Sequence, residues 1–145
     1  MVQRITPLAA FGTLASEYDS VTVDVVSRVI ADRCVIREAA NIPEIGRDWI
    51  GPQGYVDLVS TLRSTFPGFR FETHDIIGGE HALAFKGVLQ AQLPAGAFEI
   101  PVVEYWMFDA GKAVDILPVW HDVKVVHDLY WASYPERRRQ QGAGA

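Results

Sequence analysis

The spacing of apolar residues changes along the chain, from a helical period near the N-terminus to strand-like runs in the second half. The helical spacing covers residues 8–18 and returns in residues 25–30, where the β-branched side chains also suit a strand. Residues 34–39 are predicted to form a short first strand. Gly51 and Pro52 then open a further predicted helix, whose apolar stripe is Tyr55, Leu58, Val59, Leu62 and Phe66.

Four longer segments in the second half have the composition of strands and are separated by glycine- or proline-containing turns. They are residues 69–77, 81–93, 98–108 and 113–123. Pro118 cannot donate to a strand ladder, so we expect it at a sheet edge or a bulge. Helices followed by a run of strands predict an α+β domain, in which the helices cover one face of a curved, mostly antiparallel sheet and leave a pocket between the two layers.

Length and composition indicate one domain, residues 1–134, followed by a polar and solvated tail, residues 135–145. The chain has no apolar run long enough to cross a bilayer and no N-terminal signal-peptide pattern. Cys34 is the single cysteine, which favours a reducing, cytoplasmic setting. The net charge of −5 argues against a nucleic-acid partner, and we expect no membrane partner either.

One carboxylate interrupts an otherwise apolar strand. Residues 100–108 read Ile-Pro-Val-Val-Glu-Tyr-Trp-Met-Phe, a composition typical of burial, with Glu104 at the centre. Burying an acid costs free energy unless a partner holds the charge or the pKa rises until the acid is neutral. Glu104 therefore indicates either acid/base chemistry or a structural ion pair, for example with Lys86 across a strand.

Three local strings resemble known proteins. Residues 30–38 resemble the helix-to-strand passage of ketosteroid isomerases and SnoaL-like polyketide cyclases, and residues 66–77 and 108–114 are similar to two further SnoaL-like passages. The order of elements also resembles the nuclear-transport-factor-two-like cone fold, over roughly residues 9–127. This resemblance implies a cone-shaped sheet with three helices enclosing a pocket, and it says less about function because such folds host enzymes and non-enzymes alike.

The resemblance also implies roles for individual residues. In ketosteroid isomerases an acid in the strand before the last hairpin donates a hydrogen bond to the substrate oxyanion, and Glu104 lies at or next to that position. The general base of those enzymes lies at the end of the first strand, where this chain has Glu38. We expect Glu38 to stay ionised because it follows the charged Arg37. The isomerase tyrosine position is Ala15 here, and Tyr18, about one helical turn further on, is the alternative hydroxyl.

SnoaL-like cyclases place a base near the end of the last strand. An ungapped count from the hairpin puts His121 there, and a one-residue shift near Pro118 would put Asp122 there instead. We therefore treat His121 and Asp122 as one candidate position for a base.

No metal or cofactor is expected. The candidate ligands His74, Asp75, His81, His121 and Asp122 do not follow a recognised metal-binding spacing. No glycine-rich loop of the phosphate-binding type occurs between a strand and a helix.

Aromatic residues from different elements are expected to line a pocket for a small apolar substrate, although rings of this kind also fill protein cores. They are Trp49, Tyr55, Phe71, Phe85, Trp106 and Trp120.

These features predict a cofactor-independent acid/base enzyme that acts on an apolar carbonyl compound, of the isomerase, dehydratase or polyketide/terpenoid cyclase type. Three further expectations accompany it. The first alternative is a non-catalytic ligand-binding or dimerisation module of the same fold, in which Glu104 is salt-bridged and the cavity small. The second, an epoxide hydrolase, requires an arginine between two acids, and no obvious one stands on these strands. The resemblance also implies a homodimer formed through the outer face of the sheet.

Overall fold

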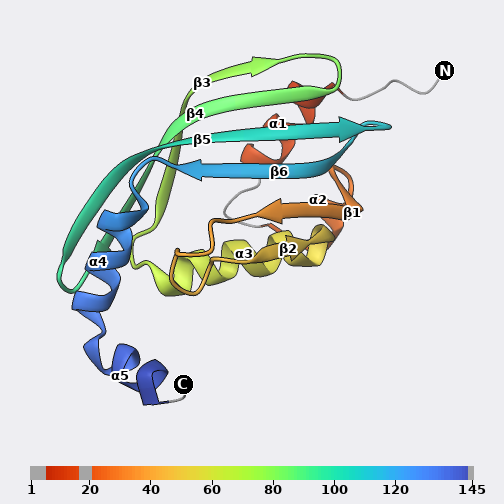
Figure 1. Cartoon of the computed structure of the whole chain (residues 1–145). Coiled ribbons are helices and arrows are strands. Elements are labelled where there is room, and N and C mark those ends of the chain that lie inside the picture. Colours follow the sequence, from red (N-terminus) through yellow and green to blue (C-terminus); the bar gives the residue numbers. More distant parts are fainter. Residues whose placement is uncertain (1–5, 17–20, 144–145) are drawn as a thin grey trace.

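A computed structural model of the chain describes residues 6–16 and 21–143, which form a strongly curved sheet with helices on its concave side and a last helix that extends away from the sheet (Figure 1). The helices are α1 (Pro7–Ser16), α2 (Val23–Ser27), α3 (Gly51–Thr65), α4 (Val123–Ser133) and α5 (Pro135–Ala143). The strands are β1 (Ile30–Arg37), β2 (Asp48–Ile50), β3 (Arg70–Gly78), β4 (Ala82–Leu93), β5 (Gly96–Asp109) and β6 (Lys112–Trp120). This is the α+β arrangement that the sequence predicts.

The strands lie in the order β2-β1-β6-β5-β4-β3, and every neighbouring pair is antiparallel except β1 and β6. The long strands β4 and β5 bend together at one end, which gives the sheet its curvature (Figure 1). The pairing of β6 with β1 ends at Ile116. Pro118 lies beyond that pair, at a locally edge-like position that suits a residue without an N–H group.

Alternate residues of the central strands face the helices and form the core. On β5 the buried residues of this alternation are Phe98, Ile100, Val102, Trp106 and Phe108, and Glu104 is the half-buried exception among them. Gly51 begins α3 with φ of 70°, and a Cβ at this position would lie 2.8 Å from the carbonyl oxygen of Asp32. A glycine is therefore needed to start the helix this close to β1.

Several elements differ from the sequence-based prediction. The first strand, β1, runs from Ile30 to Arg37 rather than over residues 34–39, and the helices α4 and α5 were not predicted. The short strand β2, which pairs with the end of β1, was not predicted. The last strand ends at Trp120 rather than Val123, because Asp122 starts the helix α4 as its N-cap. The residues expected as a polar tail are exposed as far as Gln140, and most of them form α5. Within the described residues no helix is both long and apolar enough to cross a membrane.

Candidate active site

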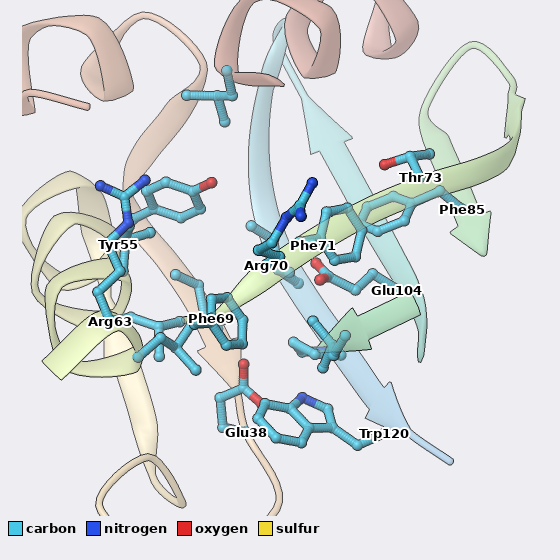
Figure 2. Close-up of a pocket in the computed structure, with 18 of the residues that line it drawn as sticks. Glu38, Tyr55, Arg63, Phe69, Arg70, Phe71, Thr73, Phe85, Glu104 and Trp120 are labelled. Atoms are coloured by element: carbon cyan, nitrogen blue, oxygen red, sulfur yellow. The ribbon is translucent and has the colours of Figure 1, made fainter. Parts of the chain in front are cut away.

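A pocket of about 570 Å³ lies between α1, α3 and the concave side of the sheet (Figure 2). This volume is within the range of small-molecule sites. Its walls are mostly apolar, and residues that are distant in sequence build them, including Phe11, Leu58, Leu62, Phe71, Phe85 and Trp106.

Two carboxyl groups from different strands face this pocket. Glu104 lies on β5, where it pairs with Phe85 of β4 on one side and with Pro118 of β6 on the other. Glu38 follows the last residue of β1 and lies two positions after the inward-facing Ile36, so it faces the same side of the sheet. The curvature of the sheet and the parallel β1–β6 pairing bring the two acids into one cavity (Figure 2).

Glu104 has one indole donor and no charged partner among the described residues. Its Oε1 accepts a hydrogen bond from Nε1 of Trp106 at 2.9 Å. Burial raises the pKa of Glu104 to about 7, and the bond from Trp106 opposes this rise because it favours the carboxylate. Lys86, the predicted alternative partner, is exposed and lies opposite Val103 in the ladder. Glu104 therefore forms no salt bridge with any described residue, as a purely structural glutamate would be expected to do.

Glu38 is more deeply buried, with 9% of its surface exposed. Burial, and then the charge of Glu104, raises the pKa of Glu38 well above its ordinary value, while hydrogen bonding from Trp120 opposes the rise. Its Oε2 is the one buried side-chain oxygen or nitrogen in the described residues that has no hydrogen-bond partner. This environment favours the neutral acid, and the sequence-based expectation that Glu38 stays ionised is wrong.

The error has a simple geometric cause. Successive side chains of a strand point to opposite faces, so Arg37 lies on the outer side of the sheet and not beside the Glu38 carboxyl. There its guanidinium lies 3.2 Å from Asp115 and 3.6 Å from Asp48. No arginine was expected between two acids on these strands, but Arg37 lies between Asp48 and Asp115. None of these three residues lines the pocket, so this arrangement does not provide an epoxide-hydrolase site there.

The remaining predicted substrate contacts divide into two groups. Five of the six predicted aromatic residues line the pocket, and they are Tyr55, Phe71, Phe85, Trp106 and Trp120. Trp49 does not, because its indole donates to the carbonyl oxygen of Ile45 at 2.9 Å and its ring packs under Arg47. Tyr18 lies outside the described residues.

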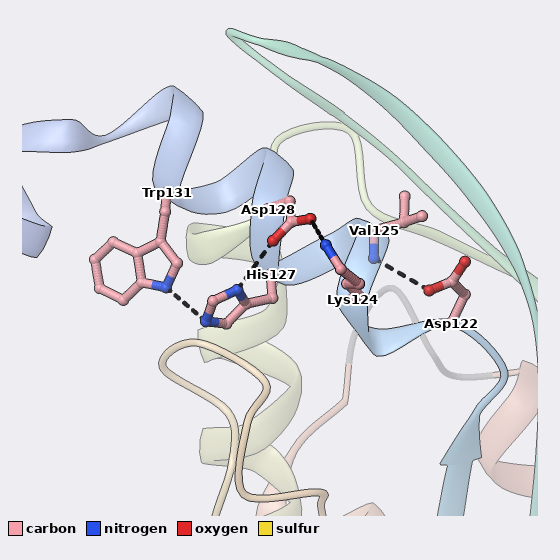
Figure 3. Close-up of polar contacts among 6 residues, drawn as sticks. All are labelled: Asp122, Lys124, Val125, His127, Asp128 and Trp131. Carbon is pink, nitrogen blue, oxygen red and sulfur yellow. Dashed lines mark hydrogen bonds and ion pairs between the residues drawn. The ribbon is translucent and has the colours of Figure 1, made fainter.

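The predicted base at the end of the last strand is not brought to the pocket. His121 is exposed, and Asp122 uses its Oδ1 to accept a hydrogen bond from the backbone N–H of Val125 at 3.2 Å (Figure 3). Asp122 is therefore the N-cap of α4. The other polar contacts in Figure 3, from Lys124 to Trp131, run along α4.

Sequence reasoning missed several groups that line the pocket. Phe11 and Leu14 of α1 were assigned only to a helix, and Phe69 only to a strand. Arg63 and Arg70, which also line the pocket, were not considered at all. For Arg70 the available signal was a single cation between two phenylalanines.

In the residues that the structure describes, no group of three or more histidine, cysteine, aspartate or glutamate side chains is arranged to hold a metal ion.

Comparison with solved structures identifies the fold, whereas comparison of the sequence alone does not. No protein-family model and no curated protein matches the sequence. A solved NTF2-like protein from Burkholderia thailandensis superposes with a TM-score of 0.75, covering 86% of this chain and 96% of its own, at 20% sequence identity. The protein has the NTF2-like fold.

Two other solved structures are also similar to this chain. A SnoaL-like polyketide cyclase from Agrobacterium tumefaciens has a TM-score of 0.66, with 16% identity over 88% of this chain and 99% of its own. TerC, co-crystallized with polyporic acid, has a TM-score of 0.73, with 13% identity over 86% of this chain and 97% of its own. The resemblance that the sequence indicated is confirmed for the fold, which is what identities this low establish.

Proposed function

We propose that this protein is an acid/base enzyme that moves a proton next to the carbonyl group of an apolar substrate, as in an isomerase, a dehydratase or a polyketide or terpenoid cyclase. The observation that carries the proposal is the pair of carboxyls, Glu38 and Glu104, that face one apolar pocket without a cationic partner among the described residues. The existence of SnoaL-like polyketide cyclases with the same fold supports this reaction class.

The two carboxyls divide the chemistry between them. Two acids that face one low-dielectric cavity do not ionise independently, because the charge of the first carboxylate raises the pKa of the second acid. Glu104 is the acid with a donor fixed on its oxygen, and its pKa of about 7 leaves much of it as carboxylate at neutral pH. Glu104 is therefore the general base that takes a proton from the carbon next to the carbonyl.

Glu38 then stabilises the negative charge that develops on the carbonyl oxygen. Its neutral form carries a proton that it can donate, and its Oε2 has no hydrogen-bond partner among the described residues. A carbonyl oxygen that becomes an enolate accepts such a bond more strongly as its charge grows, which lowers the barrier. These roles reverse the ones that the family resemblance implied.

The test is proton exchange at carbon. 2-Tetralone, an apolar ketone, is incubated with the protein in D₂O, and the loss of its α-proton signals is followed by NMR. We expect wild type to exceed the buffer rate and Glu104→Gln to lower the protein-dependent rate by about 10²-fold or more, since a positioned base contributes about 10²–10⁴-fold.

Glu99→Gln is the matched control, because Glu99 lies on the same strand with its side chain exposed. With this variant, the α-protons of 2-tetralone should exchange at the wild-type rate. Exchange at the buffer rate with wild type, together with tight binding of the ketone, would favour the non-catalytic binding module instead.

A further inference from the structure

Arg70 places a positive charge at the rim of this acidic pocket. It is the first residue of β3, the edge strand of the sheet, and its side chain is exposed yet lines the pocket. Figure 2 shows its guanidinium group beside Phe71, on the side of Tyr55 and away from Glu38. Arg70 therefore offers a solvent-accessible cation to a ligand in the pocket.

No residue that the structure describes forms an ion pair with Arg70, although other arginines of the sheet have acidic partners. Arg33 is paired with Asp109, and Arg37 with Asp115. Across the strand ladder Arg70 faces Gln90, which carries no charge. Its five N–H donors are thus available to a bound molecule.

The inner part of the pocket has the opposite electrostatic character. The carboxylate form of Glu104 repels a negative charge placed beside it, and the chain as a whole carries a net charge of −5. Apolar side chains such as Leu62 and Phe71 line the same pocket. A ligand with its carbonyl at the carboxyl pair can therefore carry a negative charge most favourably at a part that reaches a cation, and Arg70 is one of the two arginines, with Arg63, that line the pocket.

We propose that the substrate is an apolar carbonyl compound with a carboxylate at the end opposite the reacting carbonyl, and that Arg70 binds this carboxylate. The inference rests on the proposed function, since the carboxyl pair defines which end of the substrate enters first. A guanidinium group suits this task because its planar array of N–H donors matches the two oxygens of a carboxylate.

Three naphthalene probes test the proposal by fluorescence titration. 2-Naphthol presents a hydroxyl to the carboxyl pair, 2-naphthoate presents only a carboxylate, and 6-hydroxy-2-naphthoate presents both at opposite ends. The variants are Arg70→Gln, Glu38→Leu and Arg138→Gln, the last as a control because Arg138 is exposed on α5.

We expect Arg70→Gln to weaken both carboxylate probes by about five- to tenfold, the size of a solvent-accessible charge-assisted contact, and to leave 2-naphthol unchanged. Arg138→Gln should bind all three probes like wild type. Failure of 2-naphthoate to bind wild type, equal affinity of 2-naphthoate for Arg70→Gln, or a parallel loss of 2-naphthol would overturn the role of Arg70.

The same titrations separate this inference from the proposed function. Glu38→Leu should weaken 2-naphthol and leave 2-naphthoate unchanged, because only the hydroxyl probe uses the Glu38 carboxyl. If 2-naphthol does not bind wild type, or binds Glu38→Leu equally well, the proposed oxyanion-binding role of Glu38 is contradicted. The binding of 2-naphthoate to wild type and to Arg70→Gln still tests the role of Arg70 in that case.

Discussion

The proposed chemistry of this protein depends on how two similar side chains differ in their surroundings. Both are glutamates in one pocket, but Glu104 accepts a fixed hydrogen bond from Trp106 whereas one oxygen of Glu38 has no partner in the described residues. Hydrogen bonds to a carboxylate stabilise the charged form, and burial without a partner stabilises the neutral form. In the proposed reaction, this difference favours Glu104 as the base and Glu38 as the acid.

A pH-dependent stability follows from the raised pKa of Glu104. Between its ordinary value of 4.5 and about 7, the folded protein holds the proton more tightly than the unfolded chain does. This contribution to stability is complete below 4.5 and is lost as the pH rises through 7, with a slope of up to about 1.4 kcal/mol per pH unit.

Glu104→Gln removes this titration and keeps a neutral side chain of the same shape. We expect the melting temperature of the variant to rise relative to wild type as the pH is raised from 4.5 to 8, as measured by scanning calorimetry. Glu99→Gln, an exposed change on the same strand, should show no such divergence. Parallel curves for Glu104→Gln and wild type would mean that Glu104 titrates normally in the folded state.

At the scale of elements, the sequence predicts the long strands and α3 well, because their apolar patterns continue over many residues. The buried setting of Glu104 also follows from sequence, since the eight other residues of the segment 100–108 are apolar or aromatic. The ionisation of Glu38 does not, because its relevant neighbours, Glu104 and Trp120, come from other strands. Arg37, its neighbour in sequence, lies on the opposite face of the sheet.

The beginning of α4 shows how a local signal was misread. His121 and Asp122 follow the last strand directly, and an acid there resembles a catalytic base as much as a helix cap. The hydrogen bond from the N–H of Val125 to Asp122 decides for the cap.

Asp122→Ala should therefore lower the free energy of unfolding by about 1 kcal/mol, through loss of the N-cap hydrogen bond. The rate at which it exchanges the α-protons of 2-tetralone, expressed per folded molecule, should equal that of wild type. Urea denaturation measures the first quantity and NMR the second. Asp122→Asn, which retains a capping oxygen, should recover most of the stability. A loss of exchange in folded Asp122→Ala would restore this residue as a candidate base.

At the scale of the whole molecule, the sheet is apolar on both faces. Its outer face carries a contiguous group of large apolar side chains that are 43–52% exposed, and they are Val103, Tyr105, Met107, Leu117 and Val119. Ladder pairing sets Val103 opposite Val119 and Tyr105 opposite Leu117, so the group forms one patch across β5 and β6. Patches of this kind mark interaction sites on soluble proteins.

We propose that a second copy of the chain covers this patch. A self-complementary pairing of two such sheets buries apolar surface at its centre, and the ion-paired Arg37 and Asp115 lie on the same face at its polar margin. The pocket opens on the other side of the sheet, so dimer formation leaves it accessible.

Val119→Glu tests this pairing. Val119 is 52% exposed in the single chain, and a glutamate there would place an uncompensated charge at the centre of the dimer contact. We expect light scattering coupled to size exclusion to give a dimer for wild type and a monomer for Val119→Glu. Val23→Glu, which changes an exposed valine of α2, should remain dimeric. The monomeric variant should still bind 2-naphthol with wild-type affinity, because Val119 points away from the pocket. A monomeric wild type would leave the patch to a different partner.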